Sequence, residues 1–599
     1  MASPLMAVAV VFRPKGEFAG LPYVISMVSC FLDTSVELPL DVACTFGSLS
    51  LLDRIWESSI DIDNDSWTLR KFIRTELNYM HYQASKSMME AVHLKDLEMV
   101  RWLAVRFPGF RVSMEVMNLA ATSGVLDILQ FFYDHSIDHQ DTLLVAWLDN
   151  YLAAGVHSQK LEVVEWLYAH GPSEERKLNQ ALQAAVGWSN IPIAEWLLAH
   201  GATWEVDAVG LHPAHSVMEN SGSVEMLQWL DEQGQLDCIK DLLVKAASGG
   251  YIDAVHWLLD RSQRGVDIRL AIHKAASNGH LEIARLLYSR AEIPQDRDMR
   301  ELQRVEDEQQ LGYKINYWSP MVSGQSMFEA SRGGFLDVVQ WLYMELGDYP
   351  DIDLFNYREM RHESAMDAAA ANGHLNVLRF LHELQNEMHQ SKTKRGLTLP
   401  ICTTAAMDGA AANGHLAVVQ WLHEHRNEGC TAKAMDRAAR NGYLDVVKWL
   451  FKNRPDGYAA SAMDSAAESG NLELVKWLHF NTSVGCTTAA MDNAAESGSL
   501  DILEWLNSNR SEGCSKKAMV LASVNGYVRV VKWLYSHWSS MRSSSGIQTA
   551  ATLGHFEIVL FLHDHCLMER LFPGEIVNYD ISAWVMTHQQ ANEEDMYDY

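Results

Sequence analysis

The residue types best suited to chemistry gather near the C-terminal end of the chain. The run His563-Asp564-His565-Cys566, with His555 close by, carries the imidazole, carboxylate and thiol groups that bind zinc in proteins. Neighbouring residues of one helix point in different directions, and no Cys-x-x-Cys or His-x-x-x-His pair accompanies this run. We therefore predict a polar helix end rather than a metal site, and we interpret His423-Glu424-His425 in the same way.

Motifs that hold phosphate or activate a nucleophile are missing from the chain. It contains no Gly-rich phosphate loop, no Gly-x-Ser-x-Gly elbow and no protein-kinase signature. The basic stretch Lys392–Arg395 holds three charges in four residues and is too short to indicate nuclear import by itself. We predict no catalytic, metal-binding or cofactor-binding residues and no cofactor, and we expect a protein that is not an enzyme.

A set of recurring aspartates could form an acidic binding stripe. They occupy one slot of successive sequence units: Asp367, Asp408, Asp436, Asp464 and Asp492. The alternative is that each carboxylate accepts backbone hydrogen bonds from an adjoining turn. We favour this structural role, because a residue that recurs in a recurring slot usually serves the fold.

The element that positions these residues is a strict sequence repeat. The pattern Ala-Met-Asp-x-Ala-Ala-x-x-Gly-x-Leu-x-x-Val-x-Trp-Leu returns every 28 residues, with glycines at Gly414, Gly442, Gly470, Gly498, Gly526 and Gly554. Such a period is typical of a stacked solenoid, in which neighbouring units bury the apolar face that one unit cannot bury alone. We therefore predict an all-α fold, an elongated solenoid of helix–turn–helix units.

One unit, residues 462–480, explains the expected helices. Small apolar residues at helical spacing form the first helix, and Gly470 ends it because glycine adopts the left-handed conformation at little cost. Leu472, Val475 and Trp477 line one side of a second helix. Helices this short are marginal alone, so packing must stabilise them, and we interpret the recurring tryptophans as core.

These units resemble ankyrin repeats. The matching residues include Gly279-His280-Leu281, Gly373-His374-Leu375, Gly414-His415-Leu416 and the alanine pair Ala438-Ala439. The resemblance covers about residues 40–565 and implies protein binding. The family's Thr-Pro-Leu-His opening is replaced by Ala-Met-Asp, and the unit is about five residues shorter than the family norm. The family's β-hairpin finger should thus shrink to a tight turn, which makes the concave helices the better candidate surface.

Two slots of the first helix vary while their neighbours do not. Variation among near-identical repeats marks positions that the fold does not dictate, and by the resemblance these positions face the concave groove. Together with lysines at the turns, they are the predicted partner-binding residues: Lys433, Arg437, Arg440, Glu468, Asn493, Glu496, Lys516 and Lys517.

The expected organisation follows the quality of the repeat. In order we predict an N-terminal cap (1–39), degenerate ankyrin-like repeats (40–289), a charged insertion or eroded repeat (290–326), repeats with insertions (327–401), regular 28-residue repeats (402–566) and a partly disordered acidic C-terminal tail (567–599). For residues 290–326 we favour the eroded repeat.

Composition limits the kind of partner and the compartment. A net charge of −29 over 599 residues argues against nucleic acid, which requires a basic surface. Four of the eight cysteines lie on the repeat lattice, where stacking separates equivalent atoms by about 8–10 Å, so we predict free thiols and a reducing compartment. No apolar run long enough to span a membrane occurs.

The function that we predict is a non-enzymatic scaffold that binds another protein on its concave surface. We expect a monomer in the cytoplasm, with the nucleus as an alternative, secretion disfavoured, and no nucleic acid or membrane as partner. Two alternatives stay open: an enzyme-associated or catalytic subunit whose activity lies in the non-repeat segments, and a secreted effector that uses the same binding surface.

Overall fold

A computed structural model describes most of the chain, and the described residues fold into helices. These residues are 37–59, 67–108, 112–138, 150–172, 177–204, 213–236, 239–262, 268–290, 324–347, 354–355, 364–390, 399–454, 461–482, 485–538, 546–565 and 571–597. No β-strand occurs among them, so the predicted all-α repeat fold is confirmed. The segment 1–36, most of the predicted N-terminal cap, lies outside the described residues.

The chain forms two compact units, and each is described by itself. Unit 1 combines both ends of the chain, residues 1–185, 190–205 and 531–599, whereas unit 2 comprises residues 186–189 and 206–530. From the N-terminal part, unit 1 takes α4 (Leu40–Cys44), α5 (Leu49–Ser58), α6 (Leu69–Thr75), α7 (Leu77–His93), α8 (Leu97–Arg106), α9 (Met114–Ser123), α10 (Leu126–Asp138), α11 (Tyr151–His157), α12 (Leu161–His170), most of α13 (Leu178–Gly187), and α14 (Ile191–Ala199). From the C-terminal part, it takes most of α35 (Val528–His537), then α36 (Ile547–Thr552), α37 (Phe556–His565), the 3₁₀ helix η5 (Pro573–Glu575) and α38 (Tyr579–Tyr597).

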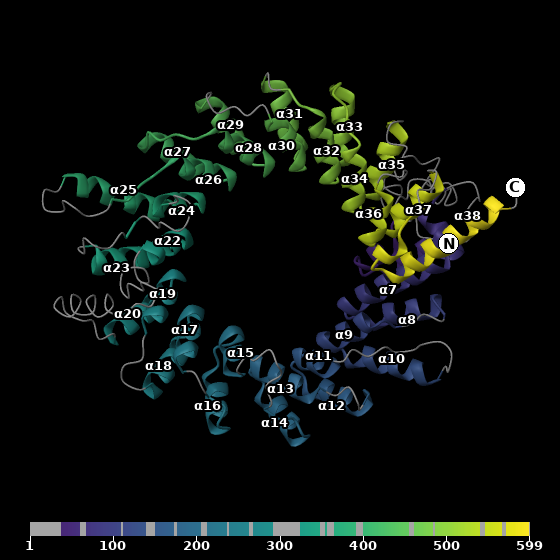
Figure 1. The fold of residues 1–599 in the computed structure, drawn as a ribbon, viewed down its shortest axis with the longest axis horizontal. Coiled ribbons are helices and arrows are strands. Elements are labelled where there is room, and N and C mark those ends of the chain that lie inside the picture. Colours follow the sequence, from purple (N-terminus) through teal and green to yellow (C-terminus); the bar gives the residue numbers. More distant parts are fainter. Residues whose placement is uncertain are drawn as a thin grey trace, which may run out of the picture. The chain divides into compact units, whose positions relative to one another are not determined.

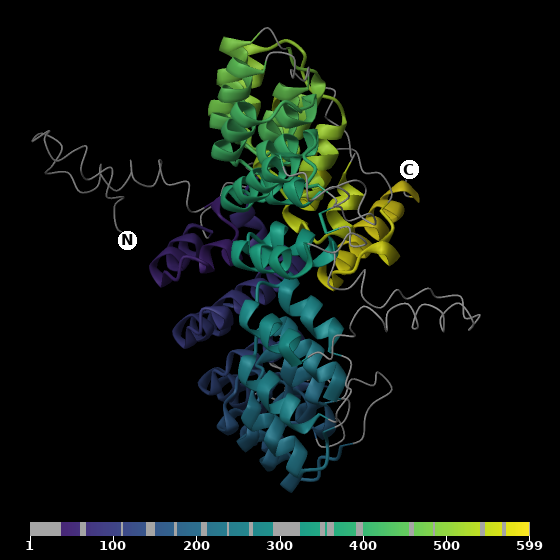
Figure 2. The same ribbon diagram turned by 90° about the vertical axis from the view of Figure 1, so that its left-hand side faces the viewer.

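Unit 2 consists of two rows of helices, because each repeat contributes one helix to each row (Figure 1). The first helices are α15 (Pro213–Asn220), α17 (Ile239–Gly249), α19 (Arg269–Ser277), α22 (Gly324–Gly333), α24 (Ala365–Ala371), α26 (Thr404–Ala412), α28 (Ala432–Arg440), α30 (Ala462–Glu468), α32 (Thr488–Glu496) and α34 (Lys517–Val524). The second helices are α16 (Val224–Glu232), α18 (Ile252–Arg261), α20 (Leu281–Arg290), α23 (Leu336–Leu346), α25 (Leu375–Gln390), α27 (Leu416–His425), α29 (Leu444–Asn453), α31 (Leu472–Asn481) and α33 (Leu500–Asn509). Figure 2 turns the repeats around α22–α25 toward the viewer.

The first helices pack much more closely along their row than the second helices do along theirs. The reason is their composition: Ala438 and Ala439 of α28 are completely buried, and such small side chains let neighbouring backbones approach. Aromatic side chains separate the second helices, as where the Phe451 ring meets the edge of Trp477 with 5.4 Å between centroids. Unit 2 therefore curves with its first helices on the concave side (Figure 1).

Two structural constraints explain the glycine between the two helices of a repeat. Gly414 has a φ of +79°, a conformation that strains other residues. In addition, a Cβ atom at this position would lie 2.6 Å from the ring of Tyr443, which the next repeat places over the glycine. Where an aromatic residue or histidine follows the glycine of the next repeat, its ring is therefore a lid on the preceding repeat; Gly442 and Gly470 lack such a ring, because Asn471 and Ser499 stand in that position.

Three positions of the degenerate repeats keep the glycine conformation without glycine. Lys95, Gln159 and Ser189 have φ values of 58°, 58° and 55°. All three occupy the glycine slot in the sequence alignment of the repeats. The turn is thus retained in the degenerate region at the cost of backbone strain.

The last repeat packs against the beginning of the chain inside unit 1. Helices α37 and α38 lie against α7: the Tyr82 hydroxyl donates to the carbonyl of Gly554, just before α37, at 2.6 Å, and Trp584 Nε1 donates to Glu76 at 3.1 Å. The part of the predicted C-terminal tail that forms α38 is therefore folded. Ile581, Trp584 and other apolar residues of α38 are buried, and the acidic cluster that suggested disorder lies beyond them.

Helices α19 and α22 are direct neighbours, although 46 residues separate them in the sequence. His273 of α19 is hydrogen-bonded through Nδ1 to the Ser326 hydroxyl of α22 at 2.7 Å, and Tyr288 meets the edge of Trp341 in the second row. Residues 291–323 lie outside the described residues. Helices α19 and α22 are therefore consecutive first helices of the row, and most of the predicted charged insertion or eroded repeat (290–326) lies outside the described residues.

Candidate functional site: the first-helix surface of the regular repeats

The recurring aspartates connect consecutive repeats. Asp408 accepts the backbone N–H of Thr431 at 2.7 Å and the Thr431 hydroxyl at 2.6 Å, one on each carboxylate oxygen. The same arrangement, which we call the Asp clamp, joins Asp367 to Thr403, Asp464 to Thr487 and Asp492 to Ser515. All four carboxylates are buried, so the structural interpretation is confirmed and these aspartates do not form a binding stripe.

Asp436 departs from this arrangement. Its Oδ1 accepts the hydroxyl groups of Ser461 and Ser465, at 2.8 and 2.7 Å. The side chain is half-buried rather than buried. Burial raises the pKa of Asp367, the first aspartate of the series, although hydrogen bonds from Thr403 and Ser364 act in the opposite direction.

A second set of inter-repeat contacts was missed by the sequence analysis. Asn441 donates its side-chain amide to the carbonyl of Ala412 in the preceding repeat at 2.7 Å, and Asn413 does the same to Ala371. We call this the Asn bridge; it recurs at Asn278 and Asn525. The available signal was an asparagine directly before the glycine in these repeats, which the predictions did not use.

The clamp and the bridge occupy the two ends of α26 and of α28 and leave the outward positions of these helices available. Of the predicted partner-binding residues, six are exposed and two are half-buried. The exposed ones are Lys433, Arg437, Arg440, Glu496, Lys516 and Lys517; the half-buried ones are Glu468 and Asn493. The intervening alanines and methionines of α28 are buried, so the variable side chains project from a fixed framework.

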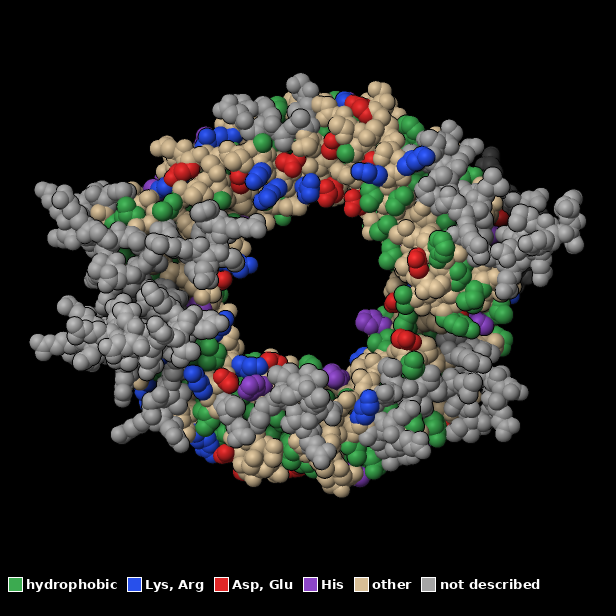
Figure 3. All heavy atoms as spheres, viewed as in Figure 1, with side chains coloured by type: hydrophobic (Ala, Val, Ile, Leu, Met, Phe, Trp, Pro, Cys, Tyr) green, Lys and Arg blue, Asp and Glu red, His purple; other side chains and the backbone are tan. Residues whose placement is uncertain are grey.

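Only two of the predicted residues form an ion pair with each other. Arg440 Nε lies 3.4 Å from Glu468 Oε2, which links α28 to α30 across the surface of the row. Asn493 instead donates its amide to the carbonyl of Asp464 at 2.9 Å, so it contributes to stacking. Basic residues on α28 and α34 flank acidic residues on α30 and α32, and Figure 3 shows the charges alternating along this edge.

The histidines that suggested metal chemistry are helix ends. His425 is bonded through Nδ1 to the Trp421 carbonyl at 2.9 Å and its ring stacks on that tryptophan, and His565 is bonded to the Phe561 carbonyl at 3.0 Å. The prediction of polar helix ends is confirmed at these two positions. In the described part of the chain, no three metal-binding side chains come together.

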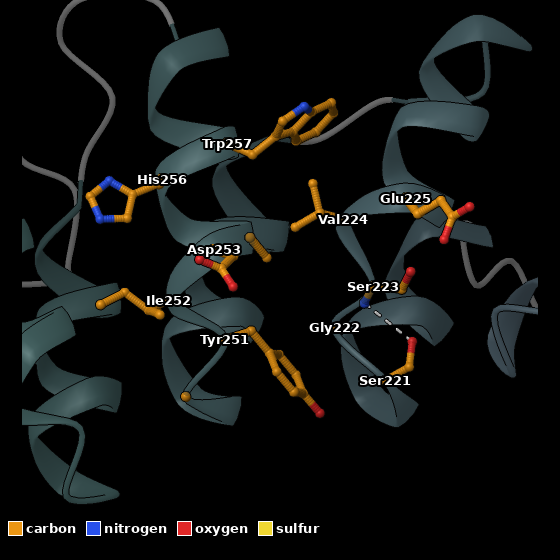
Figure 4. Close-up of a pocket in the computed structure, with 12 residues that line it drawn as sticks. Ser221, Gly222, Ser223, Val224, Glu225, Tyr251, Ile252, Asp253, His256 and Trp257 are labelled. Carbon is orange, nitrogen blue, oxygen red and sulfur yellow. Dashed lines mark hydrogen bonds between the residues drawn. The ribbon is translucent and has the colours of Figure 1, made fainter.

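An open groove of about 810 Å³ lies between the second helices α16 and α18 (Figure 4). Val224 and Glu225 line one wall, and Asp253 and Trp257 line the other. Arg261 covers one face of Trp257 at 4.3 Å from the ring centroid. Glu225 and Asp253 are exposed, so this groove is a surface depression between two repeats and none of the predicted residues lines it.

The lattice cysteines are free thiols, as predicted. Cys402, Cys430, Cys486 and Cys514 form no disulfide, and neither does Cys44 of α4. Burial raises the pKa of Cys402 to about 12 and that of Cys514 to about 11. Because the thiolate is the reactive form, these cysteines are suited to packing and not to nucleophilic chemistry.

The described fold and surface define a class of protein, a solenoid of helical repeats with a continuous first-helix face. Models of ankyrin repeats match residues 233–287, 366–460 and 463–545, which confirms the resemblance found in the sequence. The chain therefore carries ankyrin repeats, which are protein–protein interaction modules. Comparison with curated proteins gave no significant match. Among the described helices, none combines the length and apolar character needed to cross a membrane.

Proposed function

We propose that this protein is a non-enzymatic scaffold that holds another protein on the first-helix surface of α28–α34. The observation that carries the proposal is the separation of roles along each first helix. Buried alanine, methionine and aspartate residues repeat almost unchanged, whereas the slot of Arg440 holds Glu468 and Glu496 in the next two repeats and the slot of Arg437 holds Ser465 and Asn493. Exposed residues that vary on a constant buried framework support the proposal that these residues bind a partner.

The charge arrangement supports a partner with complementary charges. Arg437 and Arg440 on α28 favour acidic side chains on the partner, and so do Lys516 and Lys517 beside α34, whereas Glu496 on α32 favours a basic one. The net charge of −29 supports a protein rather than a nucleic acid as partner. The free thiols support a reducing compartment such as the cytoplasm. We further infer that the chain acts as a monomer.

The test is crosslinking pull-down from cell extract with charge-reversal variants. The test variant is Arg437→Glu/Arg440→Glu on α28; the control, Lys448→Glu/Lys452→Glu, makes the same charge change on α29 of the same repeat. We expect wild type and control to capture the same protein and the test variant to lose it. Loss in both variants would indicate a general charge effect, and retention in both would place binding elsewhere; either outcome contradicts the proposed surface.

A further inference from the structure

The contact between α7 and the last repeat has an ionisable group at its centre. Glu557 of α37 is buried, with 8% of its surface exposed. Its Oε1 accepts a hydrogen bond from Gln83 Nε2 at 2.9 Å and from the Tyr79 hydroxyl at 3.3 Å. Both donors are neutral, so they do not cancel the charge of an ionised carboxylate. The stacking contacts in unit 2 differ, because there the backbone N–H and hydroxyl of one residue occupy both oxygens of an aspartate.

Aromatic rings pack around Phe556, the residue next to Glu557 in the sequence. The Phe556 ring meets the edges of Tyr79, Tyr82 and Trp584 with 5.4–5.7 Å between centroids. Burial of the Glu557 carboxyl group beside this aromatic cluster disfavours charge. Burial raises the pKa of Glu557, and the nearby Asp41 raises it further, whereas Lys86 and the hydrogen bond from Tyr79 lower it.

We propose that this contact is a clasp between the two ends of the chain, which is closed when Glu557 is neutral and opens as Glu557 ionises at rising pH. The clasp consists of α7 on one side and α37 and α38 on the other, both within unit 1. Opening it exposes Glu557 to water, which solvates the carboxylate. The clasp would thus connect the pH of the surroundings to the accessibility of the first and last repeats.

The direction follows from proton linkage. An exposed glutamate has a pKa of about 4.3, and the closed clasp raises this value, so the closed form holds the proton more tightly. The ratio of closed to open forms therefore falls with rising pH between the two pKa values, by at most about tenfold per pH unit for one proton, and then becomes constant.

Other titratable groups at the clasp act in different pH ranges. Burial lowers the pKa of His563, which faces His588, so His563 weakens the closed form only as the pH falls below about 6.5. Burial raises the pKa of both Tyr79 and Tyr82, which keeps their hydroxyls protonated at neutral pH. Burial also raises the pKa of Asp580, and His81 opposes this shift. Because an ordinary histidine is mostly neutral above pH 6.5, measurements above it isolate the acidic groups.

Hydrogen exchange of the full-length chain, read by mass spectrometry between pH 6.5 and 8.5 and corrected for intrinsic rates, tests the clasp. In wild type we expect protection of α7 and of residues 579–588 to fall with pH by up to about tenfold per unit, while α28–α33 stay constant. Glu557→Gln, a neutral isostere, should remove this fall. Glu504→Gln, an exposed position on α33, should behave as wild type.

Two variants of half-buried residues test the same mechanism without changing Glu557 or its hydrogen-bond donors. Asp41→Asn removes a charge that raises the pKa of Glu557, and Lys86→Met removes one that lowers it. Protection of α7 at pH 8.5 should therefore rank Asp41→Asn above wild type and wild type above Lys86→Met. The proposal is overturned if wild-type protection is constant with pH, or if Glu557→Gln retains the wild-type fall. If Glu557→Gln does not fold, the ranking decides: the expected order supports the clasp and any other order overturns it.

Discussion

Replacing Asp408 with alanine should loosen the stack between α26 and α28. The carboxylate receives two hydrogen bonds from Thr431, at 2.7 Å from its backbone N–H and at 2.6 Å from its hydroxyl. A hydrogen bond to a charged group contributes about 1.5–3 kcal/mol net. The substitution removes both bonds but also the cost of burying the carboxylate, so we expect local stability to fall by about 3 kcal/mol.

Asp436→Ala is the matched control for this prediction. Asp436 lies in the equivalent position one repeat later, but its described partners are the hydroxyls of Ser461 and Ser465, and its side chain is half-buried. Hydroxyl groups can turn toward water when the carboxylate is removed, whereas the backbone N–H of Thr431 is fixed in direction. We expect a loss of about 1 kcal/mol for this variant.

Native-state hydrogen exchange of the full-length chain measures both losses locally. A fall of about 3 kcal/mol corresponds to roughly 150-fold faster exchange of the most protected amides of α28 in Asp408→Ala, and a fall of about 1 kcal/mol to roughly fivefold in Asp436→Ala, read in α30. Equal effects of the two variants would refute the reasoning, since they would show that the backbone donor and the deeper burial contribute nothing. An acceleration below about tenfold for Asp408→Ala would refute the estimated magnitude.

Three further predictions concern the turns and the thiols. Gly414→Ala should destabilise the protein more than Gly442→Ala in urea unfolding. Both glycines have a positive φ, which costs about 1–2 kcal/mol for alanine, but only at Gly414 does the new Cβ meet the ring of Tyr443, at 2.6 Å. Equal losses of stability would contradict the lid. Gln159→Gly should stabilise the protein by about 0.5 kcal/mol in the same assay. Glycine relieves the backbone strain at a φ of 58°, and this gain outweighs the greater conformational freedom that glycine gives the unfolded chain. A loss of stability would show that the turn is not strained. Iodoacetamide should alkylate Cys402 about 1000-fold more slowly in the folded than in the urea-unfolded protein at pH 8, because folding raises the pKa of this thiol from 9.0 to about 12. The alkylation rate, measured by mass spectrometry, should increase with pH. Similar rates in the folded and unfolded protein would contradict the burial of Cys402.

The repeat itself could be predicted from the sequence because its contacts recur with the sequence period. The glycine positions, the short helices and the structural role of the aspartates all follow from what one unit must offer to the next. In the degenerate repeats the structure keeps the positive φ of that glycine position at Lys95, Gln159 and Ser189. The asparagine before the glycine was visible in the sequence. The Asn bridge could be recognised only from the structure, which shows the carbonyl of the preceding repeat within hydrogen-bond distance of this asparagine. The partner-binding surface stays a prediction, since the structure contains no partner.

By itself, the sequence determined the all-α repeat, its turns and the structural role of the recurring aspartates, because those features recur with the sequence period. Only the tertiary structure decided that Glu557 meets Gln83, that Trp584 meets Glu76, and that His273 contacts Ser326 across a long insertion. Such contacts have no period. They join residues that are far apart in the sequence, and no single unit encodes such a partner in its own residues.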